Sequence, residues 1–427
     1  MVKMKDSGIE WIGEIPETWK VTPLYMCFTE RRNKNRLGKE KNLLSLSYGH
    51  IVQKNIETKG GLLPESFTTY NIIEPGDIII RPTDLQNDKR SLRTGLSNEH
   101  GIITSAYIDL EPLKNVNSKY YHYLLHSYDI QKVFYNMGNG VRQGLNYSEF
   151  SKLRVLAPKS IEQQQIADFL DHKTAEIDGL IDKINTEIDT LKQYQSSVIT
   201  RTVTKGLDPS VPMKDSGIEW IGEIPETWKT IKIKYLVDKL ERGTAPKYTE
   251  LHETQVVNQA TFSKGFFDKS NMRYSTIPAS QSRGLLQYQD VLVASTGGGV
   301  LGKVHYFTEH EEFVADSHVT IVRFIAQKLI PKFGYYYLST LYDVFNNVMA
   351  QGSTNQIELK RDTFANSFIP FPRIEEQRVI VDYLDQKVTQ IQKLINSKQQ
   401  QINQLTEYKN SLIFEYVTGK KQVKEAN

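Results

Sequence analysis

The fold is decided by the stretch EQQQIADFLDHKTAEIDGLIDKINTEIDTLKQYQSSVITRTVT, residues 162–204. Apolar residues recur in it every seven positions, at Leu170, Ile177, Ile184, Leu191 and Val198. A second apolar stripe is interpreted as lying on the same face, with Leu180, Ile181, Ile188 and Tyr194. Heptad spacing held this long predicts a coiled-coil helix. Roughly 40 residues at 1.5 Å per residue give a rod of about 60 Å.

A second copy of this pattern covers residues 376–418 and begins EQRVIVDYLDQKVTQIQKLI. The first stripe continues there through Leu384, Ile391, Leu405 and Leu412, and the second through Leu394, Ile395, Ile402 and Tyr408. Only Lys398 interrupts the first stripe, and its alkyl stem can still cover apolar surface. Each helix has an apolar seam that it cannot bury alone, so we expect the two helices to bury each other's seams.

Composition indicates a globular protein of several domains. A length of 427 residues predicts two or three of them. Hydrophobic residues make up 39% and charged residues 24%, and the net charge of +3 permits nucleic-acid binding without arguing for it. The single cysteine, Cys27, excludes an intramolecular disulfide and a cysteine-based zinc cluster. It suits a reducing compartment, and the sequence has neither a membrane-spanning run nor a signal-peptide core, so we expect a cytoplasmic protein.

The chain contains an internal duplication. Residues 4–20 read MKDSGIEWIGEIPETWK, and residues 213–229 repeat them without a change. Trp11 and Trp19 supply apolar surface and Pro16 fixes a turn, so we interpret the repeated segment as a packing device. Identity shows that two places need the same local structure, and it does not indicate chemistry at either.

Between the repeated segment and the long helix, the two halves diverge but keep landmarks in the same order. Residues 76–80 (GDIII) match residues 289–293 (QDVLV), a turn that leads into a buried strand. Residues 121–129 (YHYLLHSYD) match residues 335–343 (YYYLSTLYD), an amphipathic helix. Short β-rich runs separated by Gly, Pro, Asn and Asp fill the rest, so each half is interpreted as an α+β domain.

The predicted fold class is therefore α+β, with two related domains separated by a long antiparallel two-helix coiled coil and related by a pseudo-two-fold axis. The linker between the halves is short, so the second domain must begin near the far end of the first helix. Antiparallel pairing then needs only a compact domain at each end. The predicted order is domain 1 (1–158), central spacer helix (159–205), linker (206–212), domain 2 (213–372) and C-terminal spacer helix (373–420).

One stretch resembles a catalytic motif. Residues 297–303 read GGGVLGK, close to a phosphate-binding P-loop, but Val304 stands where that loop needs Ser or Thr, and a strand rather than a helix is predicted to follow. A nucleotide site is therefore disfavoured. Two interpretations stay open: a glycine turn that brings backbone amides and Lys303 to a phosphate backbone, or a plain hairpin turn. No other catalytic motif is present, so the sequence favours a binding protein without a metal site of its own.

Candidate DNA-binding residues lie in the divergent parts of the two halves. Arg and Lys can neutralise phosphates or read guanine, and Asn and Gln can read adenine. A first group occupies residues 81–93, where a solvated charged loop is the alternative: Arg81, Gln86, Asn87, Lys89, Arg90 and Arg93. Similar loops before the last strand of each half supply Arg142, Gln143 and Asn146, and Asn355, Gln356, Lys360 and Arg361. Further candidates are Lys247, Tyr248 and Asn258.

The whole chain resembles the DNA-specificity subunit of type I restriction–modification systems. The resemblance is carried by Pro158 followed by IEQQQIADFLD, by Pro372 followed by IEEQRVIVDYLD, by the long helix after each, and by the duplicated domain before each. It implies that each domain is a target-recognition domain for one half of a bipartite double-stranded DNA site. It also implies that the helix pair sets the gap between the half-sites.

The resemblance further implies partners that do the chemistry. Two methyltransferase subunits would dock on this chain, and restriction subunits would add translocation and cleavage. S-adenosylmethionine, ATP and magnesium would be bound by those partners and none by this chain, which would itself be non-catalytic. Two alternatives remain at this stage: a two-domain coiled-coil scaffold that binds proteins without DNA specificity, and an enzyme that uses the GGGVLGK loop as a nucleotide site.

Overall fold

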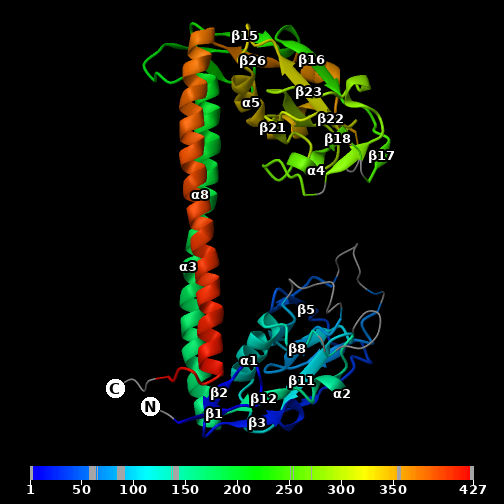
Figure 1. Ribbon diagram of the computed structural model, residues 1–427, viewed down its shortest axis with the longest axis vertical. Coiled ribbons are helices and arrows are strands. Elements are labelled where there is room, and N and C mark those ends of the chain that lie inside the picture. Colours follow the sequence, from blue (N-terminus) through cyan, green and yellow to red (C-terminus); the bar gives the residue numbers. More distant parts are fainter. Residues whose placement is uncertain are drawn as a thin grey trace. The chain divides into compact units, whose positions relative to one another are not determined.

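The structure is a computed structural model that describes residues 3–56, 64, 66–83, 92–135, 137, 144–250, 252, 254–270, 272–352 and 357–423 (Figure 1). It comprises two compact units, which we describe separately. Unit 1 contains residues 1–185 and 399–427, and unit 2 contains residues 186–398. Within the described ranges, no helix is long and apolar enough to cross a membrane.

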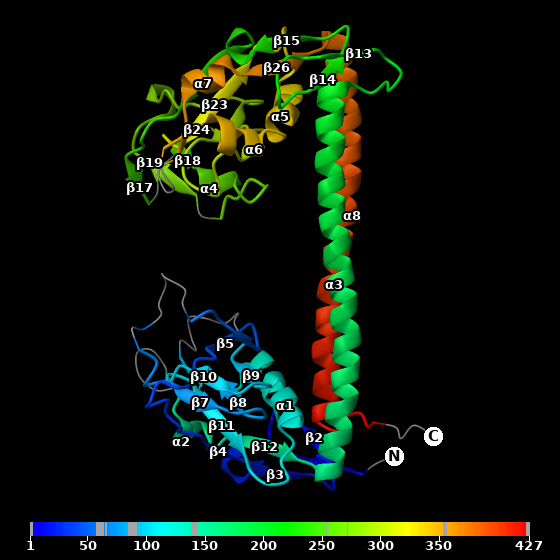
Figure 2. The same cartoon turned by 180° about the vertical axis from the view of Figure 1, so that it is seen from behind.

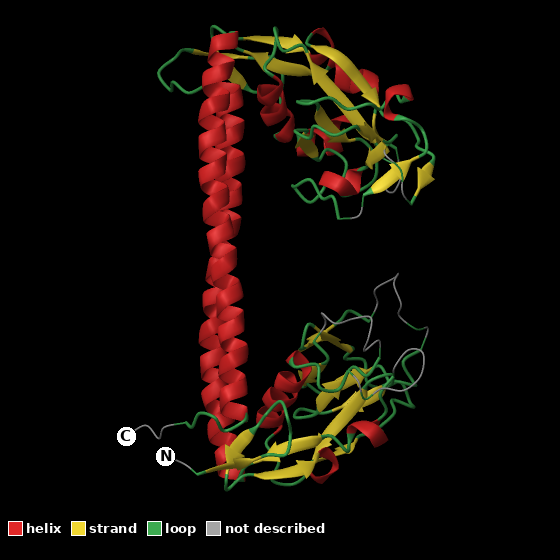
Figure 3. Ribbon diagram, in the orientation of Figure 1, coloured by secondary structure: helices red, strands yellow, loops and turns green. Residues whose placement is uncertain are grey.

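Before its long helix, unit 1 is built mostly of short strands (Figure 3). Its elements before the long helix are β1 (Met4–Asp6), β2 (Glu14–Pro16), β3 (Lys20–Pro23), η1 (Leu24–Met26), β4 (Phe28–Glu30), β5 (Leu44–Ser47), β6 (His50–Gln53), β7 (Asn71–Ile73), β8 (Ile78–Ile80), β9 (Thr94–Leu96), β10 (Gly101–Ile103), β11 (Ile108–Pro112), α1 (Ser118–Ile130), α2 (Tyr147–Phe150) and β12 (Arg154–Ala157).

Unit 2 has a similar order with additions. Its elements between the long helices are β13 (Met213–Asp215), β14 (Glu223–Pro225), β15 (Lys229–Lys232), η2 (Ile233–Tyr235), β16 (Val237–Arg242), β17 (Tyr248–Thr249), β18 (Thr254–Val257), α4 (Gln259–Phe262), β19 (Arg273–Ser275), η3 (Ala279–Gln281), β20 (Val291–Ala294), β21 (Val304–Tyr306), β22 (Phe313–Ala315), β23 (Val319–Phe324), α5 (Pro331–Ser339), α6 (Tyr342–Val344), η4 (Phe345–Met349), β24 (Ala350–Gln351), β25 (Glu358–Leu359), α7 (Arg361–Asn366) and β26 (Phe368–Phe371).

The two helices predicted from the heptads are confirmed as α3 (Ser160–Lys205) and α8 (Ile374–Val417). Each helix contributes one part to each unit. In unit 1, the rings of Phe169 and Tyr416 lie 4.4 Å apart, and Asp178 pairs with Lys409 at 2.6 Å. The contact residue on α3 advances from 169 to 178 while its partner on α8 decreases from 416 to 409, so the two segments run antiparallel there. In unit 2, the ammonium group of Lys398 pairs with Glu187 at 2.5 Å.

The first apolar stripe is the buried seam of these segments. Five of its residues are buried, namely Leu170, Ile177, Leu384, Ile391 and Leu412, and four are half-buried, namely Ile184, Leu191, Val198 and Leu405. The second stripe is only partly correct, because Leu180, Tyr194, Leu394 and Tyr408 are 48–57% exposed. Successive helical residues point about 100° apart, so adjacent residues cannot both face one partner helix.

Both units contain the same four-stranded antiparallel sheet, which we call the frame sheet. Its strand order is β4-β11-β8-β9 in unit 1 and β16-β23-β20-β21 in unit 2. One helix packs against it in each unit, α1 beside β9 (Figure 2) and α5 beside β21 (Figure 1). Both faces of the central strands are covered, since every side chain of β8 and β20 is buried. The frame sheet therefore has one face toward the helices and one toward the rest of its unit.

The repeated segment joins each unit to its long helix, which confirms its packing role. The indole N–H of Trp19 donates to Glu162 Oε1 at 2.8 Å, and that of Trp228 donates to Glu376 Oε1 at 3.0 Å. Both tryptophans are 1% exposed. Gly206 adopts a positive φ of 73° after α3, where the left-handed conformation favours glycine as a helix cap.

The contacts of α1 and α5 with the long helices shift the predicted alignment of these two helices by one position. In unit 1, Asp171 on α3 accepts hydrogen bonds from Lys119 and Tyr123 at 2.6 and 2.9 Å. In unit 2, Asp385 on α8 accepts from Lys332 at 2.7 Å and from the hydroxyl group of Tyr336. Tyr123 thus corresponds to Tyr336, whereas the sequence pattern paired it with the next residue. Runs of aromatic residues made both registers plausible, and the contact to the long helix decides between them.

Candidate nucleic-acid interface

The units differ in what covers the far face of the frame sheet. In unit 1, that face packs around a small core of Leu44, Ile73, Ile79 and Ile103, under the hairpin β5-β6 and the two-stranded sheet β10-β7. In unit 2, it packs against a larger core under a second sheet, β17-β19-β18-β22, in which β18 and β22 are parallel. One frame thus supports two different outer surfaces.

A buried aspartate at the start of the central strand is common to both units. In unit 1, Arg31 Nε donates to Asp77 Oδ2 at 2.7 Å. In unit 2, Arg323 Nη2 donates to Asp290 Oδ2 at 2.7 Å. Both carboxylates are about 1% exposed, and a buried carboxylate needs such a partner. Arg31 directly follows edge strand β4, whereas Arg323 lies in central strand β23. Because each guanidinium is paired with a buried aspartate, neither is available to bind a phosphate.

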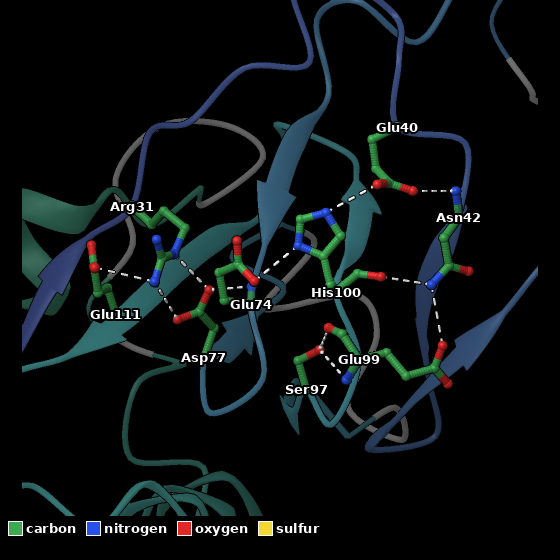
Figure 4. Close-up of polar contacts among 9 residues, drawn as sticks. All are labelled: Arg31, Glu40, Asn42, Glu74, Asp77, Ser97, Glu99, His100 and Glu111. Atoms are coloured by element: carbon green, nitrogen blue, oxygen red, sulfur yellow. Dashed lines mark hydrogen bonds and ion pairs between the residues drawn. The ribbon is translucent and has the colours of Figure 1, made fainter.

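A polar network extends from this pair across the outer part of unit 1 (Figure 4). His100 bridges two carboxylates, with Nδ1 2.9 Å from Glu74 and Nε2 3.0 Å from Glu40. The hydrogen bond to Glu74, together with the two negative charges, raises the pKa of His100. Asn42 extends the network by donating to Glu99 at 3.2 Å. The network fixes turns of unit 1, and its excess of carboxylates makes this patch a poor phosphate site.

Among the candidates in unit 1, the prediction that Arg93 binds DNA is contradicted by the structure. Its side chain is fully buried, and its Nε donates to the hydroxyl of Tyr135 at 3.1 Å. Its Nη1 donates to the carbonyl oxygens of Arg81 and Thr83, so the guanidinium holds the end of β8 instead of facing a ligand. Arg81 itself is half-buried, and its backbone N–H donates to the carbonyl of Arg93 at 2.8 Å.

Two asparagine candidates turn out to cap short helices. Asn146 Oδ1 accepts the backbone N–H of Glu149 at 3.0 Å, and Asn258 Oδ1 accepts that of Thr261 at 3.2 Å. Asn258 also forms a reciprocal capping box, because its own N–H donates to Thr261 Oγ1 at 3.2 Å. Their side-chain oxygens are therefore engaged in the N-cap interaction that asparagine favours.

The remaining described candidates in unit 2 carry exposed side chains, at Lys247, Tyr248, Lys303, Lys360 and Arg361. Lys303 lies over the ring of Tyr342, with Nζ 4.8 Å from the ring centroid. The residue after Lys303 begins strand β21. The backbone N–H of Gly297 donates to the carbonyl of Ile357 at 3.0 Å. The GGGVLGK stretch is thus a turn between two strands and lacks the helix that a P-loop requires. Arg361 Nε donates to the carbonyl of Leu240 at 2.7 Å.

Sequence reasoning missed a polar cluster at the outer part of unit 2. Gln259 Nε2 donates to Thr296 Oγ1 at 2.8 Å, and that oxygen lies 2.8 Å from Nδ1 of His318. Gln259 begins α4 after β18, and Thr296 and His318 lie in the segments after β20 and β22, so three separate segments bring these residues together. Their spacing in the sequence carries no periodic signal, so only the folded chain shows the cluster. Arg242, which donates to Glu358 at 3.1 Å, was missed for the same reason.

Eight predicted site residues lie outside the described ranges, and the structure gives no account of them. They are Gln86, Asn87, Lys89, Arg90, Arg142, Gln143, Asn355 and Gln356.

Comparison with known proteins adds an independent finding. A family model described as the type I restriction modification DNA specificity domain matches residues 96–190 and 225–404. The type I restriction enzyme MjaVIII specificity subunit of Methanocaldococcus jannaschii is 26% identical over 337 residues, covering 77% of this chain and 76% of the relative. The putative type I restriction enzyme MjaX specificity subunit of the same organism is 26% identical over 440 residues, covering 97% and 96%.

The fold also has a solved counterpart. A chain from a structure on the complex assembly and conformational transition of the type I R-M system superimposes with a TM-score of 0.68 at 15% identity. The alignment covers 95% of this chain and 99% of that one.

Proposed function

The chain belongs to the type I restriction modification DNA specificity family, and from this premise we propose that it addresses a restriction–modification complex to a bipartite DNA site. Each unit would read one half-site. The single observation that carries the proposal is that one frame sheet supports two different outer surfaces. Two readers of different sequences need a common attachment and different contact surfaces. A protein-binding scaffold without DNA specificity would not need this difference.

We divide the chain accordingly into target-recognition domains at residues 1–158 and 213–372 and spacer helices at 159–205 and 373–420, joined by the linker 206–212. The helices α3 and α8 would form one antiparallel coiled coil with a pseudo-two-fold axis. A helix of 46 residues is about 69 Å long at 1.5 Å per residue. A rod of that order would set the gap between the two half-sites.

The spacer would also dock two methyltransferase subunits. Support comes from the exposed apolar residues of the helices, because each unit presents one leucine and one tyrosine: Leu180 with Tyr408, and Leu394 with Tyr194. Matched exposed apolar side chains on a polar helix pair fit two copies of one partner. Replacing Leu180 and Leu394 by Glu should abolish co-purification of the methyltransferase subunit. The exposed Lys183→Glu should not, and equal loss with that control would contradict the docking site.

DNA contacts would come from the exposed or half-buried candidates and from the predicted residues outside the described ranges, but not from the buried Arg93. The retained residues are Arg81, Gln86, Asn87, Lys89, Arg90, Arg142, Gln143, Asn146, Lys247, Tyr248, Asn258, Lys303, Asn355, Gln356, Lys360 and Arg361. Membership of a specificity family supports a non-catalytic role. S-adenosylmethionine, ATP and magnesium would act on the methyltransferase and restriction subunits, in the cytoplasm.

The decisive experiment exchanges residues 21–150 for the corresponding part of another family member and reads the methylated motif of a host that carries the chain and its methyltransferase partner. One half-site should change, while the other half-site and the gap should stay. Exchange of residues 230–363 is the matched reciprocal and should change only the other half-site. Change in both half-sites, or in neither, would contradict the modular assignment.

A further inference from the structure

Two described arginines, Arg93 and Arg273, lie over tyrosine rings, and of these only Arg273 is exposed. Arg273 is exposed on β19, and its guanidinium lies over the ring of Tyr248 on β17, with Cζ 4.2 Å from the ring centroid. The strands pair so that Tyr248 stands opposite Ser275, two residues from Arg273 on the same face of the strand. A guanidinium held over an aromatic ring loses part of its freedom and keeps N–H groups that can donate to a ligand.

The stack is itself held in place. The hydroxyl of Tyr248 donates to Asp316 Oδ2 at 3.4 Å. Asp316 is 3% exposed, its other carboxylate oxygen accepts the backbone N–H of His318 at 2.8 Å, and its own N–H donates to the carbonyl of Val257 at 3.0 Å. A fixed carboxylate therefore positions a half-exposed ring, and the ring positions a guanidinium. Ordering the arginine beforehand lowers the entropy lost on binding.

Other well-ordered arginines are already committed inside the protein. Arg31, Arg242 and Arg323 donate to carboxylates, and Arg154 and Arg361 donate to backbone carbonyls. Within the described ranges, the guanidinium of Arg273 forms no ion pair. It is thus ordered by an aromatic ring and uncommitted to any acid, the combination expected of a reading residue.

We propose that Arg273 determines the specificity of unit 2 by donating two hydrogen bonds to a guanine in its half-site, with Tyr248 and Asp316 as positioning residues. This assignment rests on the proposed function. Guanine is chosen because its O6 and N7 acceptors match the guanidinium fork, whereas adenine offers a donor at the equivalent position. A lysine keeps the charge but lacks the fork, so it separates base reading from phosphate contact.

The test expresses the full chain with its methyltransferase subunits in a host without other DNA methylation and reads the modified motif by single-molecule sequencing. The wild-type chain should give a bipartite motif. Arg273→Lys should make one guanine of one half-site degenerate, with a loss of discrimination of roughly 5- to 150-fold at that position. The other half-site should stay unchanged, which shows that the complex is folded and active. Tyr248→Ala should relax the same position, and Tyr248→Phe should relax it less.

Several results would overturn the assignment. One is an unchanged motif with Arg273→Lys and Arg273→Ala. Another is equal relaxation by Arg283→Ala, which removes an exposed arginine of the same unit that lies over no aromatic ring among the described residues. If Arg273→Ala abolishes methylation, binding of the complex to duplexes with each base at the affected position decides. Equal weakening for all four bases would identify a phosphate contact and refute base reading. Absence of any bipartite motif with the wild-type chain would instead refute the proposed function.

Discussion

The two units make the same contacts with their long helices but differ in the outer surfaces proposed to bind DNA. Where each unit meets its long helix, the contacts are duplicated: the tryptophan donates to a glutamate, and a glutamine donates to a proline carbonyl, Gln163 to Pro158 at 2.9 Å and Gln377 to Pro372 at 3.0 Å. On the far face of the frame sheet, strand number, strand order and core differ. Constraint therefore concentrates at the base of each unit, and variation concentrates at its outer surface.

Even the shared frame tolerates substitution when the charge balance is kept. Both units bury an aspartate, but its arginine comes from the edge strand in unit 1 and from the central strand in unit 2. A buried carboxylate needs a donor, and its position on the chain is secondary.

The largest effect is expected from Arg31→Met and Arg323→Met, which leave Asp77 and Asp290 buried without their guanidinium partners. Each should destabilise its own unit by about 3–5 kcal/mol. Urea unfolding would measure the loss, and hydrogen exchange would assign it to a unit. Arg32→Met is the matched control, because the Arg32 side chain is 75% exposed and its ion pair with Glu30 should contribute little to stability. A cost confined to one unit would break the equivalence.

A gain in stability is expected from Asp109→Ile. Asp109 pairs with Ile79 in unit 1, and Ile321 pairs with Leu292, the counterpart of Ile79, in unit 2. The substitution therefore gives unit 1 the isoleucine that unit 2 has at the equivalent position. Burial, and then the charge of Asp77, raise the pKa of Asp109 to about 9. The folded state therefore keeps a proton that the unfolded state releases above about pH 4, so the wild type loses stability as pH rises between these values.

The melting temperature of the variant should accordingly exceed that of the wild type by roughly 2–8 °C near pH 8, where a gain of 1–2 kcal/mol is expected. At pH 5, the gain should be smaller. Calorimetry at the two pH values measures both, and an equal gain at each would contradict the assigned protonation of Asp109.

A smaller, symmetrical loss is expected from Trp19→Phe and Trp228→Phe. Each keeps an aromatic ring but removes the N–H that donates to Glu162 or Glu376. A hydrogen bond to a charged group contributes about 1.5 kcal/mol or more. Double-mutant cycles with Glu162→Gln and Glu376→Gln isolate this coupling from the loss of ring volume. Coupling energies that differ strongly between the units would show that the repeated segment acts differently in each.

The smallest effect is a pH dependence confined to unit 1. The folded-state pKa of His100 is raised, chiefly by its hydrogen bond to Glu74, so its contribution is complete below the unfolded value of about 6.5. That contribution is lost as pH rises through the folded pKa. With 48% of the side chain exposed, it should stay below about 1 kcal/mol. Hydrogen exchange of β7 and β10, corrected for intrinsic rates, should show weaker protection at pH 8 than at pH 6, and His100→Gln should remove the difference.

The sequence predicted best what depends on local periodicity. Heptads located both long helices to within two residues at each end, and the turn before residues 78–80 and 291–293 located the central frame strands. The exposed Leu180 shows the limit of this reasoning, because a stripe drawn on one helix does not say how wide a face the partner covers. The one-residue error in α1 arose because aromatic residues fit either register.

Site residues were predicted less well, because they depend on tertiary contacts. Arg93 and Arg273 are both basic residues in divergent segments, and sequence gives no reason to rank them. In the structure, the first is enclosed by Tyr135 and backbone carbonyls, and the second is displayed on Tyr248. Tyr248 was predicted from the sequence, but Arg273, the arginine that lies over its ring, is 25 residues away and belongs to no motif.

The ends of the long helices have a consequence for connectivity. In unit 1, Gly419 follows α8 with a positive φ, a side chain there would overlap the ring of Pro16, and Lys420 donates to the carbonyl of Ile12 at 2.8 Å. In unit 2, Gly206 follows α3 and lies against Trp228 and Pro225 in the corresponding way. The segment after α8 thus packs on unit 1 through non-covalent contacts, as the start of the covalent linker 206–212 packs on unit 2. A circular permutant cut between residues 206 and 212, with residues 423 and 3 joined by a short linker, should keep these contacts, because all of their residues remain in the chain.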